Sequence, residues 1–440
     1  MAARLLTALF TALMIWAGTQ GQGQSIIRDA EIERGLRELA APILAEAGLP
    51  RSVRIVVVND DSLNAFVADR RHIFIYSGLL MRLETPAEVQ AVIAHEAAHL
   101  ANGHLTTRAG AGSRASAGAA LGLALALAVA STGNSEAGLG IAAGTQSAAL
   151  RNFLSHTRAQ EASADQSALR YMVSAGIDPQ AMRDVLELFR GQEALSAGRQ
   201  DPYLRTHPLT RDRLRSIEAF IAGRVGTSYA SSPEAQYWYD RTLAKLSAFL
   251  RDPRWTLSQI GSQTDEISTL RRAIALHRRS APSDALAAMS RLLGLRPNDA
   301  YYQELQGQIL FESRQFSAAV AAYGRAVQLA PREALILAGY GRALLALETS
   351  GNDRTALDAL ERSYAQEPAN PRMLRDLALA YARTGSPGMA SSVTAERFAL
   401  IGQLDTAAIH AERASGLLPS GSPGWQRAQD VLRAAQSAQN

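Results

Sequence analysis

The sequence contains no cysteine among its 440 residues. This absence excludes disulfide bonds, a cysteine nucleophile, cysteine-ligated zinc or iron–sulfur clusters, and lipid attachment to cysteine. Any metal site must therefore use nitrogen and oxygen ligands. Lysine is almost absent too, because Lys245 is the only lysine among 45 basic residues, and the formal charge is only +4. Since no block of basic residues is available to neutralise phosphates, the composition does not support nucleic-acid binding.

The length predicts two or three domains, and an apolar fraction of 47% is normal for globular folds. The N-terminus has the pattern of an export signal, in which Arg4 precedes an apolar run over residues 5–17 and a small, polar stretch over 18–25. We expect residues 1–24 to be a signal peptide. The alternative is a short uncleaved anchor, although the run is shorter than the ~20 residues that span a bilayer.

The first half of the chain predicts a mainly helical domain with a small sheet. Apolar spacing predicts a helix over 29–48. Runs rich in valine, isoleucine and aromatic residues predict short strands, which we expect to form a small antiparallel sheet, over 51–59, 64–67 and 72–76. Thr85 and Pro86 begin a further helix that should run to about 103, with Glu88 completing a capping box.

An alanine-rich and glycine-rich segment follows over residues 115–144. Its apolar part, residues 115–130, is too short for a clear membrane span, so we interpret it as a buried or flap-like helix, with membrane contact as the alternative. A long helix is expected over 148–174, and another begins after Pro179.

After about residue 254 the chain shows a helical repeat. Pro297 and Pro331 are 34 residues apart and Pro368 follows 37 later, which is tetratricopeptide spacing. Small residues recur at the positions where paired helices cross closely, namely Gly307, Gly341, Ala285, Ala319, Ala356 and Ala407. We therefore predict an all-α solenoid of about four repeats over residues 255–440, one of them irregular around 385–389, after a first domain over 25–254.

The sequence HEAAH at residues 95–99 lies within the helix that Thr85 begins. His95 and His99, at i and i+4, lie on one helical face ~6 Å apart, so both imidazoles can bind one ion. Glu96 then lies beside the ion, where its carboxylate can take a proton from water whose pKa the metal lowers to ~7. The pattern predicts a hydrolytic zinc site.

A second helix carries Glu161 and Asp165, again at i and i+4. A catalytic zinc needs three protein ligands and one exchangeable position, and with no cysteine available Glu161 is the natural third ligand. Asp165 can accept the free ring N–H of a ligating histidine and so fix its tautomer. The alternative is that the two carboxylates simply form a solvated helix face.

Four motifs occur in a familiar order: Asn64-Ala65-Phe66 on a strand, HEAAHL at 95–100, RAQEASAD at 158–165, and THP at 206–208 with Arg213 six residues past the histidine. Over residues 51–217 the chain thereby resembles the zinc metallopeptidases that include HtpX and the CAAX prenyl proteases. With its export signal and repeats, the whole chain is similar to the periplasmic, BepA-like branch of that family, which serves outer-membrane protein assembly and quality control.

The resemblance implies one Zn²⁺ held by His95, His99 and Glu161, with Glu96 as the base. It also implies that Asn64, His207 and Arg213 line the cleft. The long insert before Glu161 departs from the integral-membrane members, because it lacks convincing membrane spans.

His207 and Arg213 carry charge or polarity that suits the oxyanion formed during peptide hydrolysis. His207 is equally compatible with a second role, in which it binds zinc as a fourth ligand and silences the enzyme. A histidine that only caps the turn before Pro208 is the third possibility. The other histidines, His72, His104, His156, His277 and His410, show no partner pattern.

The strand over 64–67, with Asn64, Ala65 and Phe66, is a candidate sheet edge at which an extended substrate adds backbone hydrogen bonds. An ordinary interior strand is the alternative. We expect a periplasmic zinc endopeptidase acting on unfolded or misassembled envelope proteins, peripheral to a membrane at most, whose repeats bind substrates or the outer-membrane assembly machinery. The rivals are a chaperone or adaptor scaffold with an autoinhibited protease, and an integral CAAX-type protease.

Overall fold

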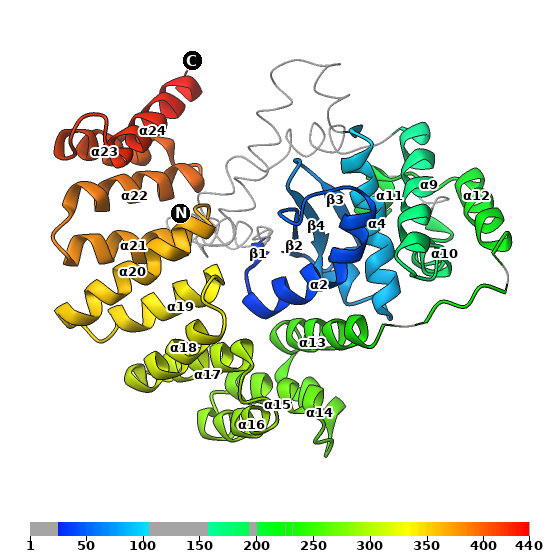
Figure 1. Cartoon of the computed structure of the whole chain (residues 1–440), viewed down its shortest axis with the longest axis horizontal. Coiled ribbons are helices and arrows are strands. Elements are labelled where there is room, and N and C mark those ends of the chain that lie inside the picture. Colours follow the sequence, from blue (N-terminus) through cyan, green and yellow to red (C-terminus); the bar gives the residue numbers. More distant parts are fainter. Residues whose placement is uncertain (1–24, 105–156, 193–199, 225, 231, 440) are drawn as a thin grey trace, which may run out of the picture.

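The computed structural model describes residues 25–104, 157–192, 200–224, 226–230 and 232–439, and it shows a helix-rich chain with one small sheet (Figure 1). The expected fold class is confirmed. The predicted signal over residues 1–24 and the alanine-rich segment over 115–130 lie outside the described residues. Within the described ranges, no helix is both long and apolar enough to cross a membrane.

The sheet has four strands in the order β1-β2-β4-β3. Strand β1 (Ser25–Ile27) runs antiparallel to β2 (Arg54–Asn59), and β3 (Ala65–Val67) runs antiparallel to β4 (His72–Tyr76). The expectation of a wholly antiparallel sheet is wrong for the central pair, since β2 and β4 are parallel. The reason is that β3 and β4 form a hairpin whose second strand inserts beside β2. This insertion leaves β3 at the edge, as expected.

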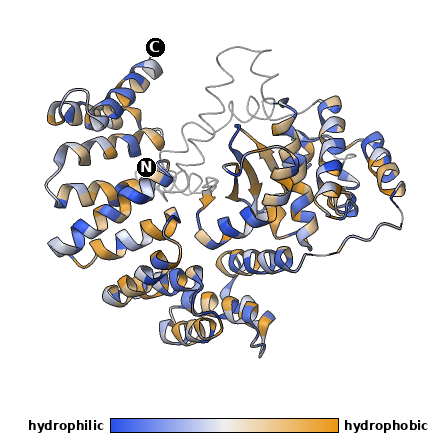
Figure 2. Cartoon of the chain, in the orientation of Figure 1, coloured by the Kyte–Doolittle hydropathy of each residue, from blue (hydrophilic) through white to orange (hydrophobic). Residues whose placement is uncertain are grey.

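Seven described helices surround or follow the sheet in the first half of the chain. They are α2 (Ala30–Glu46), α3 (Ser77–Leu80), α4 (Pro86–Ala101), α9 (Arg158–Ser174), α10 (Gln180–Glu187), α11 (Pro202–Thr206) and α12 (Arg211–Ala222). Helices α2 and α4 pack on one face of the sheet, and the core there includes Leu36, Ile43, Ile75 and Val92. Figure 2 shows the strands as largely hydrophobic, which fits their burial.

Helix α4 begins where the sequence predicts. The Thr85 side chain accepts a hydrogen bond from the Glu88 N–H at 3.2 Å, and Pro86 occupies the first turn. The Glu88 carboxylate accepts from the Glu84 N–H at 2.7 Å, one residue before the cap that we expected it to reach. The start of the helix is thus fixed by local interactions, and these set the position of the histidines along it.

The second half of the chain is a solenoid of helices that curves beside the first half (Figure 1). Helix α13 leads into it, and each later helix packs on its neighbours. The bounds are α13 (Pro233–Leu250), α14 (Pro253–Ile260), α15 (Glu266–Arg278), α16 (Pro282–Leu295), α17 (Ala300–Glu312), α18 (Phe316–Leu329), α19 (Ala334–Leu345), α20 (Ser350–Gln366), α21 (Pro371–Arg383), α22 (Pro387–Leu400), α23 (Leu404–Leu417) and α24 (Pro423–Gln439).

Two glycines show why the positions at which paired helices cross require small side chains. A Cβ added at Gly307 would lie 2.7 Å from the Tyr323 ring, and one added at Gly341 would lie 2.5 Å from Leu360. Distances of this size cannot be accommodated without moving the neighbouring helix. The close helix crossings expected of a tetratricopeptide solenoid are therefore present.

Buried charges join the two halves of the chain. Arg241 and Lys245 on α13 are fully buried. The Arg241 guanidinium contacts Glu31 on α2 and Asp299 before α17, both at 2.6 Å. Lys245 Nζ lies 3.6 Å from Glu304 on α17. Because a buried ion left without its partner is costly, these pairs hold α2, α13 and α17 in one arrangement.

A second group of charges links the sheet to the solenoid. Arg28 and Arg54 each bind both Glu33 on α2 and Glu367 at the end of α20, with N–O distances of 2.6–2.7 Å. We call these four residues the charged ring. It ties the end of α20 to the catalytic half.

Candidate metal centre

Helix α4 places the first three site residues. His95, Glu96 and His99 are all buried, with at most 1% of each residue exposed. Their neighbours on α4 are small or aliphatic and pack into the core, which leaves these three as the polar groups of that stretch. The two ligating candidates point the same way, since His95 Nε2 and His99 Nε2 are 3.2 Å apart.

Helix α9 brings the acidic residues to the same point. It begins with a reciprocal capping box between Thr157 and Gln160, which places Glu161 in its first turn. Glu161 carboxylate oxygens lie 3.3 Å from His95 Nε2 and 3.3 Å from His99 Nε2. Burial alone would raise the pKa of Glu161, but His207 and the two α4 histidines hold it well below its usual value. The carboxylate is therefore ionised, as a metal ligand must be.

His207, directly after α11, completes a group of four. Its Nδ1 atom lies 3.1 Å from Glu161 Oε1 and 3.3 Å from His95 Nε2. One nitrogen or oxygen atom from each of the four residues lies within 4.8 Å of the other three. Such a cluster of converging nitrogen and oxygen atoms is the donor set that a zinc ion takes in proteins.

The spacing of these atoms provides a test of fit. Ligands ~2.0–2.1 Å from a tetrahedral zinc stand ~3.3–3.4 Å apart, because a tetrahedron's edge is ~1.6 times its centre-to-corner distance. The five contacts among His95, His99, Glu161 and His207 given above measure 3.1–3.3 Å, with Glu161 facing His95 through Oε2 and the other two histidines through Oε1. Donor atoms this close together can contact one zinc ion, with His207 as the candidate fourth ligand.

Asp165 and Arg213 lie behind the ligands. Asp165 Oδ1 is 3.1 Å from His95 Nδ1, the nitrogen that faces away from the cluster. Burial lowers the pKa of His95, but the Asp165 and Glu161 carboxylates outweigh it and hold the pKa at about 10. Asp165 therefore stabilises a proton on His95 Nδ1, which is the contact that its predicted orienting role requires, and the role itself stays a prediction.

Arg213 binds Asp165 through Nε at 2.7 Å and through a terminal nitrogen at 2.8 Å. Its other terminal nitrogen donates to the Pro208 carbonyl at 2.9 Å and lies 2.8 Å from Glu161 Oε2. All three guanidinium nitrogens are thus used inside the protein. The structure therefore places Arg213 as a support for the two carboxylates.

His104 lies against the back of His99, which the sequence analysis missed. The two Nδ1 atoms are 2.9 Å apart, and His104 is buried. The residue follows the last turn of α4, nine positions after His95. That spacing alone carries no signal, because it lies outside the regular helix. His95 is therefore backed by a carboxylate and His99 by an imidazole.

Glu96 has the environment of a base. Neither carboxylate oxygen has a hydrogen-bond partner among the described residues, and the nearest recorded polar contact is His207 Nε2 at 3.5 Å. Burial raises the pKa of Glu96 above its usual value. An isolated carboxylate beside a metal position with a raised pKa is suited to accept and return a proton.

The edge strand β3 is covered by α11 at its free side. The Tyr203 N–H donates to the Leu63 carbonyl at 3.2 Å, and His207 Nε2 lies 3.3 Å from the Ala65 carbonyl. The Tyr203 ring stacks on His207 with ring centroids 4.7 Å apart. The sequence did not predict this short helix or Tyr203. The same helix therefore reaches both β3 and the metal cluster.

The three residues predicted to bind substrate are distributed around β3. Asn64 is buried, its carbonyl accepts from the Tyr76 N–H, and its Oδ1 atom has no partner in the described part of the chain. Ala65 presents its carbonyl at the free edge. The Phe66 ring stacks on Phe74 on the other face of the sheet, so only its backbone is available at the edge.

Comparison with known proteins agrees with this geometry. Residues 27–221 match peptidase family M48. The chain is 24% identical over 405 residues to the β-barrel assembly-enhancing protease of Escherichia coli K12, covering 90% of this chain and 81% of that protein. It is 23% identical over 387 residues to the Yersinia pestis protein of the same name, covering 87% and 79% of the two chains. Among solved structures, MamA from Desulfovibrio magneticus is 18% identical and covers 38% of this chain and 95% of its own, with a TM-score of 0.33.

The matched residues contain the whole cluster, from the edge strand β3 to Arg213 on α12. A family of metallopeptidases and a buried set of nitrogen and oxygen ligands point to the same chemistry. Residues 27–221 therefore combine a match to peptidase family M48 with the buried ligand set of a metalloprotease.

Proposed function

We propose that the chain is a periplasmic zinc-dependent endopeptidase that cleaves unfolded or misassembled envelope proteins, and that its solenoid binds those substrates or the outer-membrane assembly machinery. The observation that carries the chemical part is the buried convergence of four ligand atoms, one from each residue, within 4.8 Å of one another. The names of the relatives, which are β-barrel assembly-enhancing proteases, support the envelope setting.

In this proposal His95, His99 and Glu161 would hold a zinc ion, which would supply Lewis acidity for the attacking water and the peptide carbonyl. Glu96 would accept a proton from the water and deliver it to the leaving amine, for which its isolated, buried carboxylate is suited. Asp165 orients His95, and Arg213 fixes Asp165 and Glu161 in place. A substrate strand adds to the free edge of β3.

The test is hydrolysis of fluorescently labelled casein by the purified full-length protein. We expect a chelator to abolish hydrolysis and added Zn²⁺ to restore it. Glu96→Gln should reduce the rate to background, because the amide cannot accept the proton. A matched control is Glu218→Gln, which changes an exposed residue of α12 in the same way. Retained activity in purified Glu96→Gln would overturn the assignment.

A second function is favoured by the position of His207. Its Nδ1 atom lies 3.1 Å from Glu161 Oε1, among the candidate ligand atoms, and α11 and His207 also contact the Leu63 and Ala65 carbonyls at the edge of the sheet. We propose on this basis that the peptidase is held inactive until α11 moves, so that the solenoid acts as a chaperone or adaptor scaffold in the inactive state. If His207 instead donates a hydrogen bond to the oxyanion during hydrolysis, it must first leave the ligand cluster, which requires the same movement of α11.

Two experiments separate these functions. If His207 blocks the metal, His207→Ala should raise casein hydrolysis, whereas a fall would support the donor role and no change would contradict both. In cells that lack the protein, full restoration of envelope integrity by Glu96→Gln would establish the scaffold function. A complete failure of Glu96→Gln to restore it would assign the function to peptide hydrolysis.

A further inference from the structure

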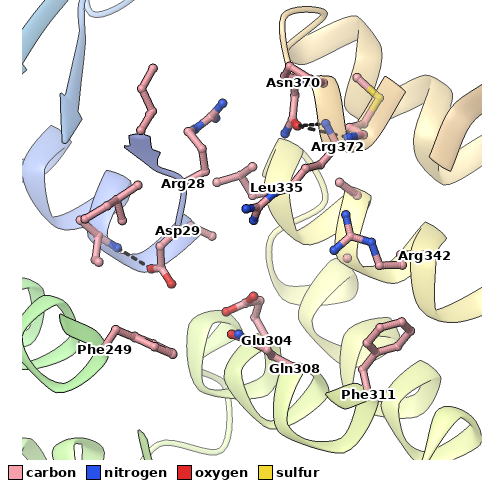
Figure 3. Close-up of a pocket in the computed structure, with 18 of the residues that line it drawn as sticks. Arg28, Asp29, Phe249, Glu304, Gln308, Phe311, Leu335, Arg342, Asn370 and Arg372 are labelled. Carbon is pink, nitrogen blue, oxygen red and sulfur yellow. Dashed lines mark hydrogen bonds between the residues drawn. The ribbon is translucent and has the colours of Figure 1, made fainter. Parts of the chain in front are cut away.

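A cavity of about 440 Å³ lies where the solenoid meets the catalytic half of the chain. Its walls come from the segment before and at the start of α2, from the end of α13, and from α17, α18, α19 and the start of α21 (Figure 3). The volume is within the range of pockets that hold small ligands or a few residues of a peptide. None of the metal-site residues lines it.

One side of the cavity is rich in arginine. Arg342 on α19 uses Nε to donate to Asp376 at 2.6 Å, and its two terminal nitrogens have no hydrogen-bond partner among the described residues. The guanidinium of Arg372, at the start of α21, likewise makes no hydrogen bond or ion pair with any described residue. Arg28 of the charged ring also lines the cavity. In Figure 3 these arginines lie around Leu335.

The positive charge on this side is only partly balanced. Arg372 is an exposed residue whose pKa is lowered by partial burial of its guanidinium and further by the neighbouring arginines, Arg342 first among them. Asp376, which Arg342 binds, and Glu312, which also lines the cavity, oppose this charge. Arg28 is paired with Glu33 and Glu367. Two arginines with unused donors at one wall form a site for an anion, and their planar geometry suits a carboxylate.

The opposite side offers apolar surface and acidic groups, since Asp29, Glu304 and Glu312 also line the cavity. Phe249 and Phe311 stand on either side of Glu304 in Figure 3. Glu304 Oε2 lies 3.6 Å from Lys245 Nζ, so this carboxylate belongs to the charges that join the two halves of the chain. Burial raises the pKa of Glu304, and the Lys245 ammonium opposes that shift.

We propose that this cavity binds a short extended peptide through a carboxylate at Arg342 and Arg372, with apolar side chains of the peptide packed against Phe249 and Phe311. The inference deepens the proposed role of the solenoid in protein binding, and it makes no use of the metal centre. The carboxylate belongs either to the end of a polypeptide or to an acidic side chain, since both present the same oxygens.

The experiment measures peptide binding to full-length Glu96→Gln by fluorescence anisotropy, so that no peptide is cut. Three labelled apolar hexapeptides are compared: one with a free C-terminal carboxylate, one amidated without any acid, and one amidated with a single glutamate. At least one of the two carboxylate peptides should bind about tenfold more tightly than the neutral one, because each bidentate contact is charge-assisted. Which of the two binds identifies the source of the carboxylate.

Arg372→Gln, added to Glu96→Gln, should remove that preference. The substitution is suitable because Arg372 supports no ion pair in the fold. Arg354→Gln is the matched control, since it removes the same charge from an exposed position on α20 that does not line the cavity. Equal binding of all three peptides, absence of binding, or an unchanged preference in folded Arg372→Gln would overturn the proposal. Failure of casein hydrolysis would instead concern the metal centre, because this assay needs no cleavage.

Discussion

Asp165→Asn tests how the metal centre obtains its affinity. The substitution keeps the shape of the side chain but removes the charge that lies 3.1 Å from His95 Nδ1. It also turns an amide N–H₂ toward either Arg213 or His95, both of which have only donors to offer there. Loss of the group that orients a ligating histidine typically weakens metal binding by ~10–100-fold, or ~1.4–2.7 kcal/mol.

The upper part of that range is expected here, because Asp165 acts on two ligands. It contacts His95 directly, and it fixes Arg213, which in turn lies 2.8 Å from Glu161 Oε2. The measurement is the zinc dissociation constant of the full-length protein, obtained by competition with a chromophoric chelator. Asp212→Asn provides the control, because Asp212 is 89% exposed and forms only a surface pair. An unchanged zinc affinity in folded Asp165→Asn would refute this account of the site.

Three further substitutions probe other contacts. His104→Leu should weaken zinc binding by ~10-fold or more, because it removes the acceptor behind His99. His104→Asn should retain most of the affinity, because its Oδ1 can take the place of His104 Nδ1. Equal losses of zinc affinity in both variants would contradict an orienting role for His104. In a urea titration, Gly35→Ala should lower the free energy of unfolding by ~1–3 kcal/mol, because the new Cβ would lie 2.0 Å from an α13 side-chain oxygen. The control is Gly294→Ala, which should be neutral or stabilising because its new Cβ meets nothing within 4 Å. Glu367→Gln should cost ~1–2 kcal/mol at pH 7, since the charged ring is partly exposed. Burial opposes ionisation of Glu367, but Arg28 and Arg54 lower its pKa from 4.5 to about 2, so the difference from wild type should be full above pH 4.5 and fade toward pH 2. A difference that stays constant across that range would show that the ring is not its source.

The local parts of the site were predictable from the sequence. Thr85 and Pro86 define the start of α4, and the i, i+4 spacing then fixes His95 and His99 on one face. The same spacing predicts that Glu161 and Asp165 share a face of α9, and the absence of cysteine favours Glu161 as the third ligand. Each of these inferences depends on contacts within a few residues, which helical periodicity describes well.

The contacts that the sequence did not predict are between segments. The parallel pairing of β2 with β4 depends on where the β3–β4 hairpin inserts, and strand propensity does not record that choice. The contact of His104 with His99 depends on how the chain turns after α4 ends. Tyr203 reaches β3 from a five-residue helix that has no periodic pattern to identify it.

Arg213 and His207 show why residue type alone leaves a role open. An arginine near an oxyanion site is chemically suited to stabilise charge, yet four of the five N–H groups of this guanidinium already face Asp165, Glu161 and a backbone carbonyl. For His207 the deciding quantity is distance, because Nδ1 stands one tetrahedral edge from two ligand atoms while Nε2 faces the edge of β3. In the inactive state proposed above, Nδ1 takes the position of the attacking water and Nε2 faces the strand edge that a substrate would use. Peptide hydrolysis in that proposal requires displacement of α11, which makes His207→Ala the most direct test of whether catalysis is gated.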